Sequence, residues 1–194
     1  MSTDKVLDLG VMADYELSYD SHISSIVSKA RFRSGIIFKS FHSHNISLLR
    51  QAFISFVRPI LEYASKVWNP SILKYTAYLE SVQRNFTYRI QSNKHLSYPE
   101  RLAILNLEPL ELRRVKTDLL MYYKILNNLI PISPDDHFTK RTDTFIHARA
   151  SGTGLLLKPL CRSNRIGNHF FFRSIEAWNT LPSTITNASS PLMF

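Results

Sequence analysis

The sequence contains one pair of adjacent carboxylates, Asp135-Asp136. Converging carboxylates can hold the two metal ions of a nucleotidyl-transfer site. This pair follows Pro-Ile-Ser-Pro, in a segment of turn-forming residues where Asp usually caps a helix or completes a turn. Asp8 and Asp14 flank the first apolar segment and would need further carboxylates to bind a metal. The acidic residues therefore indicate neither a catalytic group nor a metal site.

The histidines and the single cysteine give no stronger indication of catalysis. His42 and His44 share one segment without a neighbouring cysteine or carboxylate, so a surface position is favoured over zinc binding. Cys161 and His169 are too isolated to indicate a nucleophile and its base. The segment "SGTGLLLK", residues 151–158, lacks the glycine spacing of a phosphate-binding loop. A complete enzyme of another class would require a convergent polar pocket, which the sequence does not indicate.

Lysine and arginine form the pattern with the clearest chemical meaning. Together they number 24 against 15 Asp and Glu, which gives a net charge of +9 and a pI near 9.8. Residues 26–116 contain fifteen basic and five acidic residues, whereas residues 1–25 contain one Lys and five acids. This distribution favours a polyanionic partner such as nucleic acid. An equally weighted alternative is that the basic side chains only solvate the outer faces of helices.

Apolar residues repeat at helical spacing through most of the chain. Residues 5–14 predict one short strand and a turn. Helices are predicted over residues 20–41, 47–68 and 71–90, from Ser97, within residues 108–129, and over residues 168–179. Pro59 lacks the N–H that would bond to the carbonyl of residue 55, so it should kink the second helix by opening that turn. Ser97 and Glu100 form the Ser-x-x-Glu pattern of a helix N-terminus. The predicted apolar face of the second helix consists of Leu49, Phe53, Phe56, Ile60, Ala64 and Val67.

These elements predict a mainly α fold, with a bundle of about five helices, a short N-terminal strand, an irregular connector and a C-terminal helix. The expected parts are residues 1–19 for the strand, 20–130 for the bundle, and 131–194 for the connector, last helix and tail. The connector contains two β-like patches, at residues 144–148 and 154–160. The aromatic run at residues 170–172 should cover apolar surface of the bundle, and the tail from Pro182 is expected to have little order.

The sequence also bears on the cellular compartment. One cysteine cannot form an internal disulfide, and residues 1–25 lack the basic and apolar regions of a signal peptide. No apolar run approaches the roughly 20 residues of a membrane span. We therefore expect an intracellular protein of the nucleus or cytoplasm, not secreted and without a membrane partner.

Six blocks of the sequence resemble, in order, the C-terminal part of reverse transcriptases of non-long-terminal-repeat retrotransposons of the jockey-like kind. The resemblance extends from about Lys5 to Pro182. The blocks are "DLGVMADYELSYDSHISSIVSKA", "FVRPILEYASKVWNP", "LESVQRNFTYRI", "LSYPERLAILNLEPLELRR", "DLLMYYKILNN" and "FFFRSIEAWNTLP". The resemblance implies that residues 1–19 are a remnant of the edge strand of the polymerase palm. It also implies that the helices are the thumb and its C-terminal extension.

A thumb grips the duplex of template and primer, so the resemblance implies contacts to an RNA or DNA backbone. Arg113 and Arg114 add a local oddity, because positive charge in the first turn of a helix opposes the helix dipole. Such a placement is easier to understand if the residues serve a ligand. Charge and resemblance together predict phosphate contacts from Lys29, Arg31, Arg33, Arg58, Lys66, Lys74, Arg84, Arg89, Arg113 and Arg114.

The sequence departs from the family at its catalytic motif. The family's Phe/Tyr-Ala-Asp-Asp motif is absent from the sequence, and the fingers and most of the palm should precede residue 1. The resemblance therefore implies a fragment that is inactive alone, with Mg²⁺ bound only by the missing palm and no small-molecule substrate. The missing palm and fingers are a further expected partner. The alternatives are a non-enzymatic helical interaction module, or a truncated remnant of a mobile element without selected function.

Overall fold

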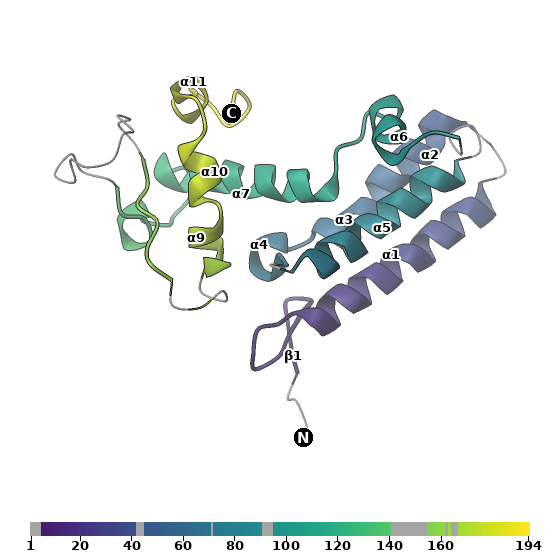
Figure 1. The fold of residues 1–194 in the computed structure, drawn as a ribbon, viewed down its shortest axis with the longest axis horizontal. Coiled ribbons are helices and arrows are strands. Elements are labelled where there is room, and N and C mark those ends of the chain that lie inside the picture. The colour runs from purple at the N-terminus through teal and green to yellow at the C-terminus, as the bar shows by residue number, and fades with distance from the viewer. Residues whose placement is uncertain are drawn as a thin grey trace. The chain divides into compact units, whose positions relative to one another are not determined.

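The computed structural model describes residues 5–41, 45–70, 72–90, 95–140, 155–161, 163 and 167–194. These residues form a mainly helical protein with a short antiparallel sheet at the N-terminus, which confirms the predicted fold class (Figure 1). The chain divides into two compact units, Met1–Arg114 and Val115–Phe194. The division falls inside helix α7, Leu110–Leu126, whereas the sequence placed the end of the bundle at residue 130.

The N-terminal segment is a hairpin rather than a single strand. The turn residues Leu9 and Gly10 have φ angles of 44° and 83°, both in the left-handed region. Two such residues make the tight turn that suits the twist of a two-residue hairpin. The predicted strand therefore pairs with the residues that follow it, in the register Leu7 to Met12. The two strands are β1, Val6–Asp8, and β2, Val11–Ala13.

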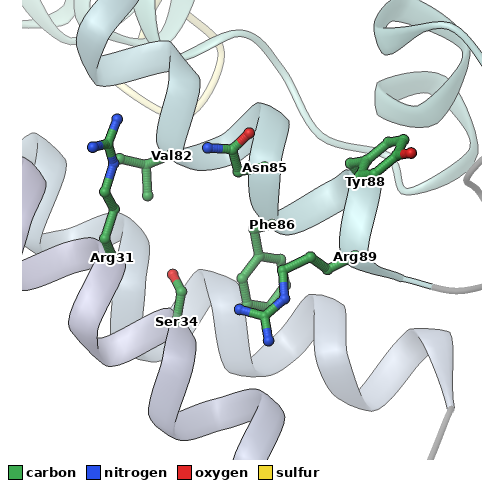
Figure 2. A pocket seen from close by; sticks show the side chains of 7 residues that line it. All are labelled: Arg31, Ser34, Val82, Asn85, Phe86, Tyr88 and Arg89. Atoms are coloured by element: carbon green, nitrogen blue, oxygen red, sulfur yellow. The ribbon is translucent and has the colours of Figure 1, made fainter.

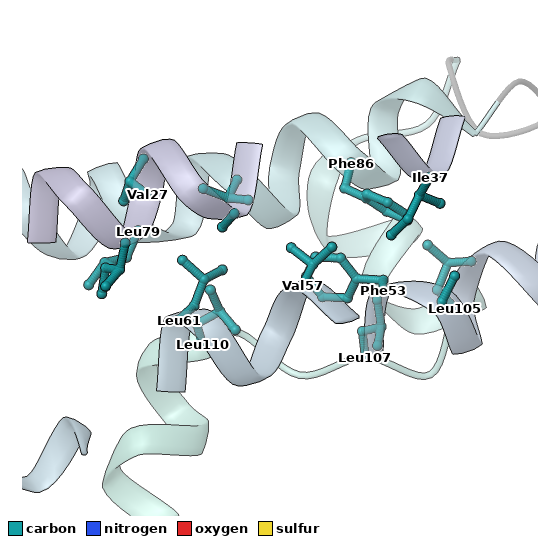
Figure 3. Packing of buried hydrophobic residues seen from close by; sticks show 14 of the residues in the cluster. Val27, Ile37, Phe53, Val57, Leu61, Leu79, Phe86, Leu105, Leu107 and Leu110 are labelled. Carbon is teal, nitrogen blue, oxygen red and sulfur yellow. The ribbon is translucent and has the colours of Figure 1, made fainter. Parts of the chain in front are cut away.

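Two long helices provide one side of the core of the first unit. Helix α1 spans Asp20–Ser40 and helix α5 spans Leu73–Arg89. The apolar residues that repeat at helical spacing here are largely buried, since Val27 of α1 and Leu79 and Phe86 of α5 are at most 1% exposed (Figure 3). Burial of these side chains supplies most of the favourable free energy of packing. The α1 and α5 pair is therefore held by its apolar faces and leaves its polar flanks at the surface.

The predicted continuous helix over residues 47–68 is wrong. A π-helical turn precedes Pro59, and the N–H of Arg58 donates to the carbonyl of Phe53. Pro59 has no N–H, and in a regular α-helix its ring would clash with the carbonyl four residues back. The wider π turn removes this clash, and the opening of the turn before Pro59 was predicted from the sequence. Ala64 then adopts a left-handed φ of 52°, which ends the helix. The segments are α2, Ile46–Ala52; the π turn η1, Phe53–Val57; α3, Arg58–Glu62; and α4, Ser65–Trp68.

The wide turn shifts the apolar face of this segment. Phe56 and Val67, which were predicted to face the core, are 55% and 57% exposed. Val57 and Leu61 are fully buried in their place (Figure 3), and so is Trp68. The indole Nε1 of Trp68 donates to the carbonyl of Tyr63 at 2.7 Å, as a buried indole N–H requires a partner. The predicted buried face is correct up to Phe53, where the turns are α-helical. Beyond Phe53, each buried position lies one residue later in the sequence than predicted.

Two polar contacts fix the helices that follow. Helix α6, Tyr98–Ile104, begins at a capping box of Ser97 and Glu100, which confirms the predicted start. Helix α7 begins at Leu110, whose N–H donates to Oε2 of Glu80 at 2.9 Å. The hydroxyl of Tyr98 donates to the same carboxylate, and burial together with this bond raises the pKa of Tyr98. A carboxylate at a helix N-terminus satisfies backbone N–H groups and interacts favourably with the positive end of the helix dipole.

The second unit surrounds the C-terminal part of α7. Tyr122 is fully buried and its hydroxyl donates to the carbonyl of Phe170 at 2.9 Å. The predicted last helix is broken at Ser174 into two short helices, so the aromatic run packs on the core around Tyr122. The tail was predicted to have little order, which is wrong: it forms a further short helix and Phe194 packs on Trp178. The elements are η3, Pro134–Asp136; α9, Phe170–Arg173; α10, Ile175–Asn179; and α11, Ser183–Thr186.

In the connector, Lys140 and Leu156 form an isolated antiparallel bridge. The predicted β-like patch at residues 144–148 lies outside the described residues, as does the start of the patch at 154–160. The described helices include none long and apolar enough to span a membrane.

Candidate nucleic-acid interface

A pocket of about 290 Å³ opens between α1 and α5 in the first unit (Figure 2). The core residues Val82 and Phe86, which are 2% and 1% exposed, lie beneath it, and the remaining lining side chains are polar, charged or aromatic. Two of the predicted phosphate-binding residues, one from each helix, are therefore brought to one site. The lining residues are Arg31 and Ser34 of α1, and Val82, Asn85, Phe86, Tyr88 and Arg89 of α5.

Helical spacing explains how these residues share a site. Val82, Asn85 and Arg89 are separated by three and four residues, which places them along one face of α5. Arg31 and Ser34 are related in the same way on α1. The hydroxyl of Ser34 donates to the carbonyl of Ala30 at 2.8 Å, so it is turned towards its own helix. The pocket is thus lined by two helix edges that the apolar core holds together.

The two arginines are positioned by aromatic rings. Arg31 lies 4.8 Å from the ring centroid of Tyr78, and its Nη2 donates to the hydroxyl of Ser81 at 3.0 Å. Arg89 lies 4.1 Å from the ring centroid of Phe38. Among the described residues, neither guanidinium forms an ion pair with a carboxylate. Both positive charges are therefore available to an external anion.

Four further predicted cations are exposed on the same two helices but lie apart from the pocket. Lys29 and Arg33 are each two residues from Arg31, a rotation of about 200°, and so project from the opposite flank of α1. On α5, Arg84 lies 4.8 Å from the ring centroid of Tyr98. Lys74, at the start of α5, lies 5.7 Å from the ring of Tyr75. The structure therefore divides the predicted cations into separate groups.

Arg58 and Arg113 share one carboxylate. Arg113 donates to Glu62 at 2.5 and 3.1 Å, and this contact raises the pKa of Arg113. Arg58 lies 3.9 Å from the same carboxylate, and desolvation followed by repulsion from Arg113 lowers the pKa of Arg58. The unusual positive charge at the start of α7 thus has an internal explanation, an ion pair with α3. The position of Arg113 is therefore explained by Glu62 without a ligand.

Arg114 is not a surface residue. Its side chain is 2% exposed, and its Nε donates to the side-chain oxygen of Asn69 at 2.9 Å. This burial disfavours the predicted phosphate contact of Arg114, because a phosphate could reach the guanidinium only after the groups that cover it had moved. Lys66 is half-buried on α4.

Sequence reasoning missed Arg101, which supports one wall of the pocket. Arg101 is 5% exposed and donates from Nη1 to the carbonyl of Leu96 at 2.6 Å and from Nε to Thr87 at 3.3 Å. Its guanidinium lies 5.6 Å from the ring centroids of Tyr88 and Tyr98. The only signal in the sequence was an arginine in the first turns of a short helix, which does not distinguish a buried residue from an exposed one.

The remaining chemical candidates do not converge. Asp135 and Asp136 lie in the 3₁₀ turn η3, as turn chemistry predicted. Within the described residues, no group of three or more His, Cys, Asp or Glu side chains could hold a metal ion. His42 and His44 lie outside those residues.

Comparison with known proteins adds one distant similarity. The chain is 27% identical over 127 residues to an uncharacterized protein of Caenorhabditis elegans. The match covers 64% of this chain and 64% of that protein, so the chain spans about two thirds of the length of the curated relative it matches. No family model matches the chain. No solved structure matches it either.

Proposed function

We propose that this chain binds the sugar–phosphate backbone of nucleic acid without reading its sequence. The observation that carries the proposal is the pocket between α1 and α5, where Arg31 and Arg89 approach one site without carboxylate partners among the described residues. Arginine is suited to this task because its planar guanidinium can donate two parallel hydrogen bonds to phosphate. Arg84, exposed on α5, adds a further positive charge.

The resemblance of the six sequence blocks gives the proposal its biological setting. We propose that the helices correspond to the thumb and downstream part of a non-long-terminal-repeat reverse transcriptase, which holds the RNA–DNA duplex. The partners would then be that duplex and the palm and fingers of the polymerase, in the nucleus or cytoplasm. The sequence contains no Phe/Tyr-Ala-Asp-Asp motif, so we assign no catalytic residue and no Mg²⁺ site to this chain.

A salt titration tests the proposal. The dissociation constant for a labelled RNA–DNA duplex would be measured by fluorescence anisotropy across a range of monovalent salt. Release of counterions from phosphates lowers the logarithm of the affinity by about 0.9 per contact for each unit of log salt on B-form DNA. We expect a slope that corresponds to several phosphates. Binding that is absent at low salt, or unchanged by salt, refutes the proposal.

The hairpin supports a second candidate function, a non-enzymatic interaction module. Val6, Leu7 and Leu9 are 62%, 69% and 84% exposed, so β1 presents apolar side chains to solvent. Exposed apolar surface of this kind often marks a contact with another protein. Leu7→Lys would abolish binding to a protein partner while leaving duplex affinity unchanged or slightly increased. The genomic DNA upstream of residue 1 can be read for an in-frame Asp-Asp motif. Its presence would indicate part of an intact polymerase, and its absence would favour a truncated remnant.

A further inference from the structure

We propose that the outward face of α1 holds one unpaired nucleotide of a single strand, with its base stacked on Phe32 and its flanking phosphates at Arg31 and Lys39. This inference rests on the proposed function, since it adds a base to the backbone contact assigned to Arg31. It goes beyond that function because a backbone contact alone requires no aromatic ring.

The surface for the base is the exposed ring of Phe32. Helix α1 packs against β2, α3 and α5 through the side that carries Val27 and Ala30, which are completely buried (Figure 1). Phe32 lies on the opposite side of the helix and is 73% exposed, and Ile36, one turn later, is 38% exposed. The ring therefore contributes little to the core of this unit. Exposed aromatic rings are the platforms on which unpaired bases stack.

Gly35 leaves an open space beside this ring. It follows Phe32 by three residues, so the two are neighbours on the helix surface. A Cβ added at Gly35 would meet no atom within 4 Å. Glycine in the interior of a helix lowers its stability relative to alanine, and packing among the described residues does not require glycine here. The space beside Phe32 is therefore open to the edge of a stacked base.

Two cations lie on either side of this space. Arg31, Gly35 and Lys39 follow one another at intervals of four, so the two cations are about 12 Å apart along the helix axis. Helix α1 has no acidic residue after Asp20. Within the described part of the chain, neither Arg31 nor Lys39 forms an ion pair with a carboxylate. The phosphates before and after one stacked base would therefore each meet a cation.

A single strand matches this face better than a membrane surface does. Helices that lie in the membrane interface bury a broad apolar face. The outward face of α1 offers only Phe32 and Ile36, with serines and cations around them. One ring between two cations instead matches a strand in which planar bases alternate with phosphates.

An abasic probe separates stacking from charge. Anisotropy would be measured for labelled oligothymidylate and for the same strand with abasic residues in place of the bases, which keeps every phosphate. We expect the abasic strand to bind about tenfold more weakly, since stacking of one base contributes roughly this factor. Phe32→Leu should bring the ratio of the two affinities close to one without changing the salt slope, because it removes the ring and no charge. Phe32→Tyr should keep the ratio, and Phe56→Leu, at a phenylalanine that is 55% exposed on η1, is the matched control.

Gly35→Gln tests the open space separately from the ring. Glutamine would extend into the space beside Phe32, and it favours helices more than glycine does. We expect a higher melting temperature together with a lower ratio, so that a loss of stability cannot explain the weaker binding. An unchanged ratio in this variant contradicts the proposed position of the base.

The outcomes distinguish this inference from the function on which it rests. Salt-dependent binding with equal affinity for both strands refutes stacking on Phe32 and leaves backbone binding intact. A ratio that Phe32→Leu does not change, or that Phe56→Leu lowers equally, also refutes it. Phosphatidylserine vesicles that displace the oligonucleotide and bind the wild type and Phe32→Leu equally would show a membrane surface instead. Absence of salt-dependent binding to any nucleic-acid probe refutes both proposals.

Discussion

Replacing Arg31 and Arg89 together by Gln removes both cations of the pocket. The exposed pair Lys29 and Arg33 supplies a matched control, because Lys29→Gln with Arg33→Gln removes the same charge from the opposite flank of α1. Gln is shorter than Arg and uncharged, so the pocket variant also loses the contacts of the guanidinium groups with Tyr78, Phe38 and Ser81. Both double variants lower the net charge of the chain equally, and the pocket variant should melt at a slightly lower temperature, which is measured before the binding assays.

The expected effect follows from the contacts in the structure. If Arg31 and Arg89 each neutralise one phosphate, their loss reduces the salt slope by about 1.8 on B-form DNA or about 1.4 on a single strand. The control variant should lose affinity only through its weaker long-range attraction, which is screened beyond about 10 Å at 0.1 M salt. Anisotropy titrations at several salt concentrations measure both quantities. Equal slopes for the two double variants would contradict the assignment of the pocket as the phosphate site.

Three predictions concern stability. Arg173→Met leaves the buried carboxylate of Asp118 without its ion pair. It should lower the free energy of unfolding, measured by urea denaturation, by about 3 to 5 kcal/mol, and adding Asp118→Leu should restore most of this loss. Desolvation and Lys29 lower the pKa of His22, so the folded state takes up its proton less readily than the unfolded state. Acidification below about pH 6.5 should therefore lower the melting temperature more in the wild type than in His22→Asn, which retains an acceptor for the N–H of Met12. Ala64→Gly relieves the left-handed backbone and should stabilise the fold by about 0.5 kcal/mol; a lower melting temperature would contradict this.

Much of the helical framework could be predicted from the sequence because its signals are local. The capping pattern of Ser97 and Glu100 identifies the start of α6, and the spacing of Leu79, Val82 and Phe86 identifies the buried face of α5. Each signal depends on residues that are three or four positions apart. Such contacts form within one helix whatever surrounds it.

The candidate site could be predicted only in part. Charge identified Arg31 and Arg89 as exposed cations, but helical spacing alone did not show that they line one pocket. The sequence also gave no means to separate them from Arg113, whose carboxylate partner Glu62 is 51 residues away. The pairing of two helices decides which cation meets a carboxylate. The break at Ala64 was missed for a different reason, since alanine favours helices and its left-handed backbone is set by the tertiary structure.

The wide turn at Phe53–Val57 has a consequence for comparison of related sequences. The buried residues Leu49, Phe53, Val57 and Leu61 recur at intervals of four, whereas a straight α-helix needs intervals of three and four to keep one face buried. The turn therefore behaves as a one-residue insertion that leaves the core contacts in place. Pro59 is what requires it. A relative without proline at this position is expected to have one residue fewer between its counterparts of Leu49 and Leu61. An alignment without a gap would then pair core residues of the relative with exposed residues of this chain.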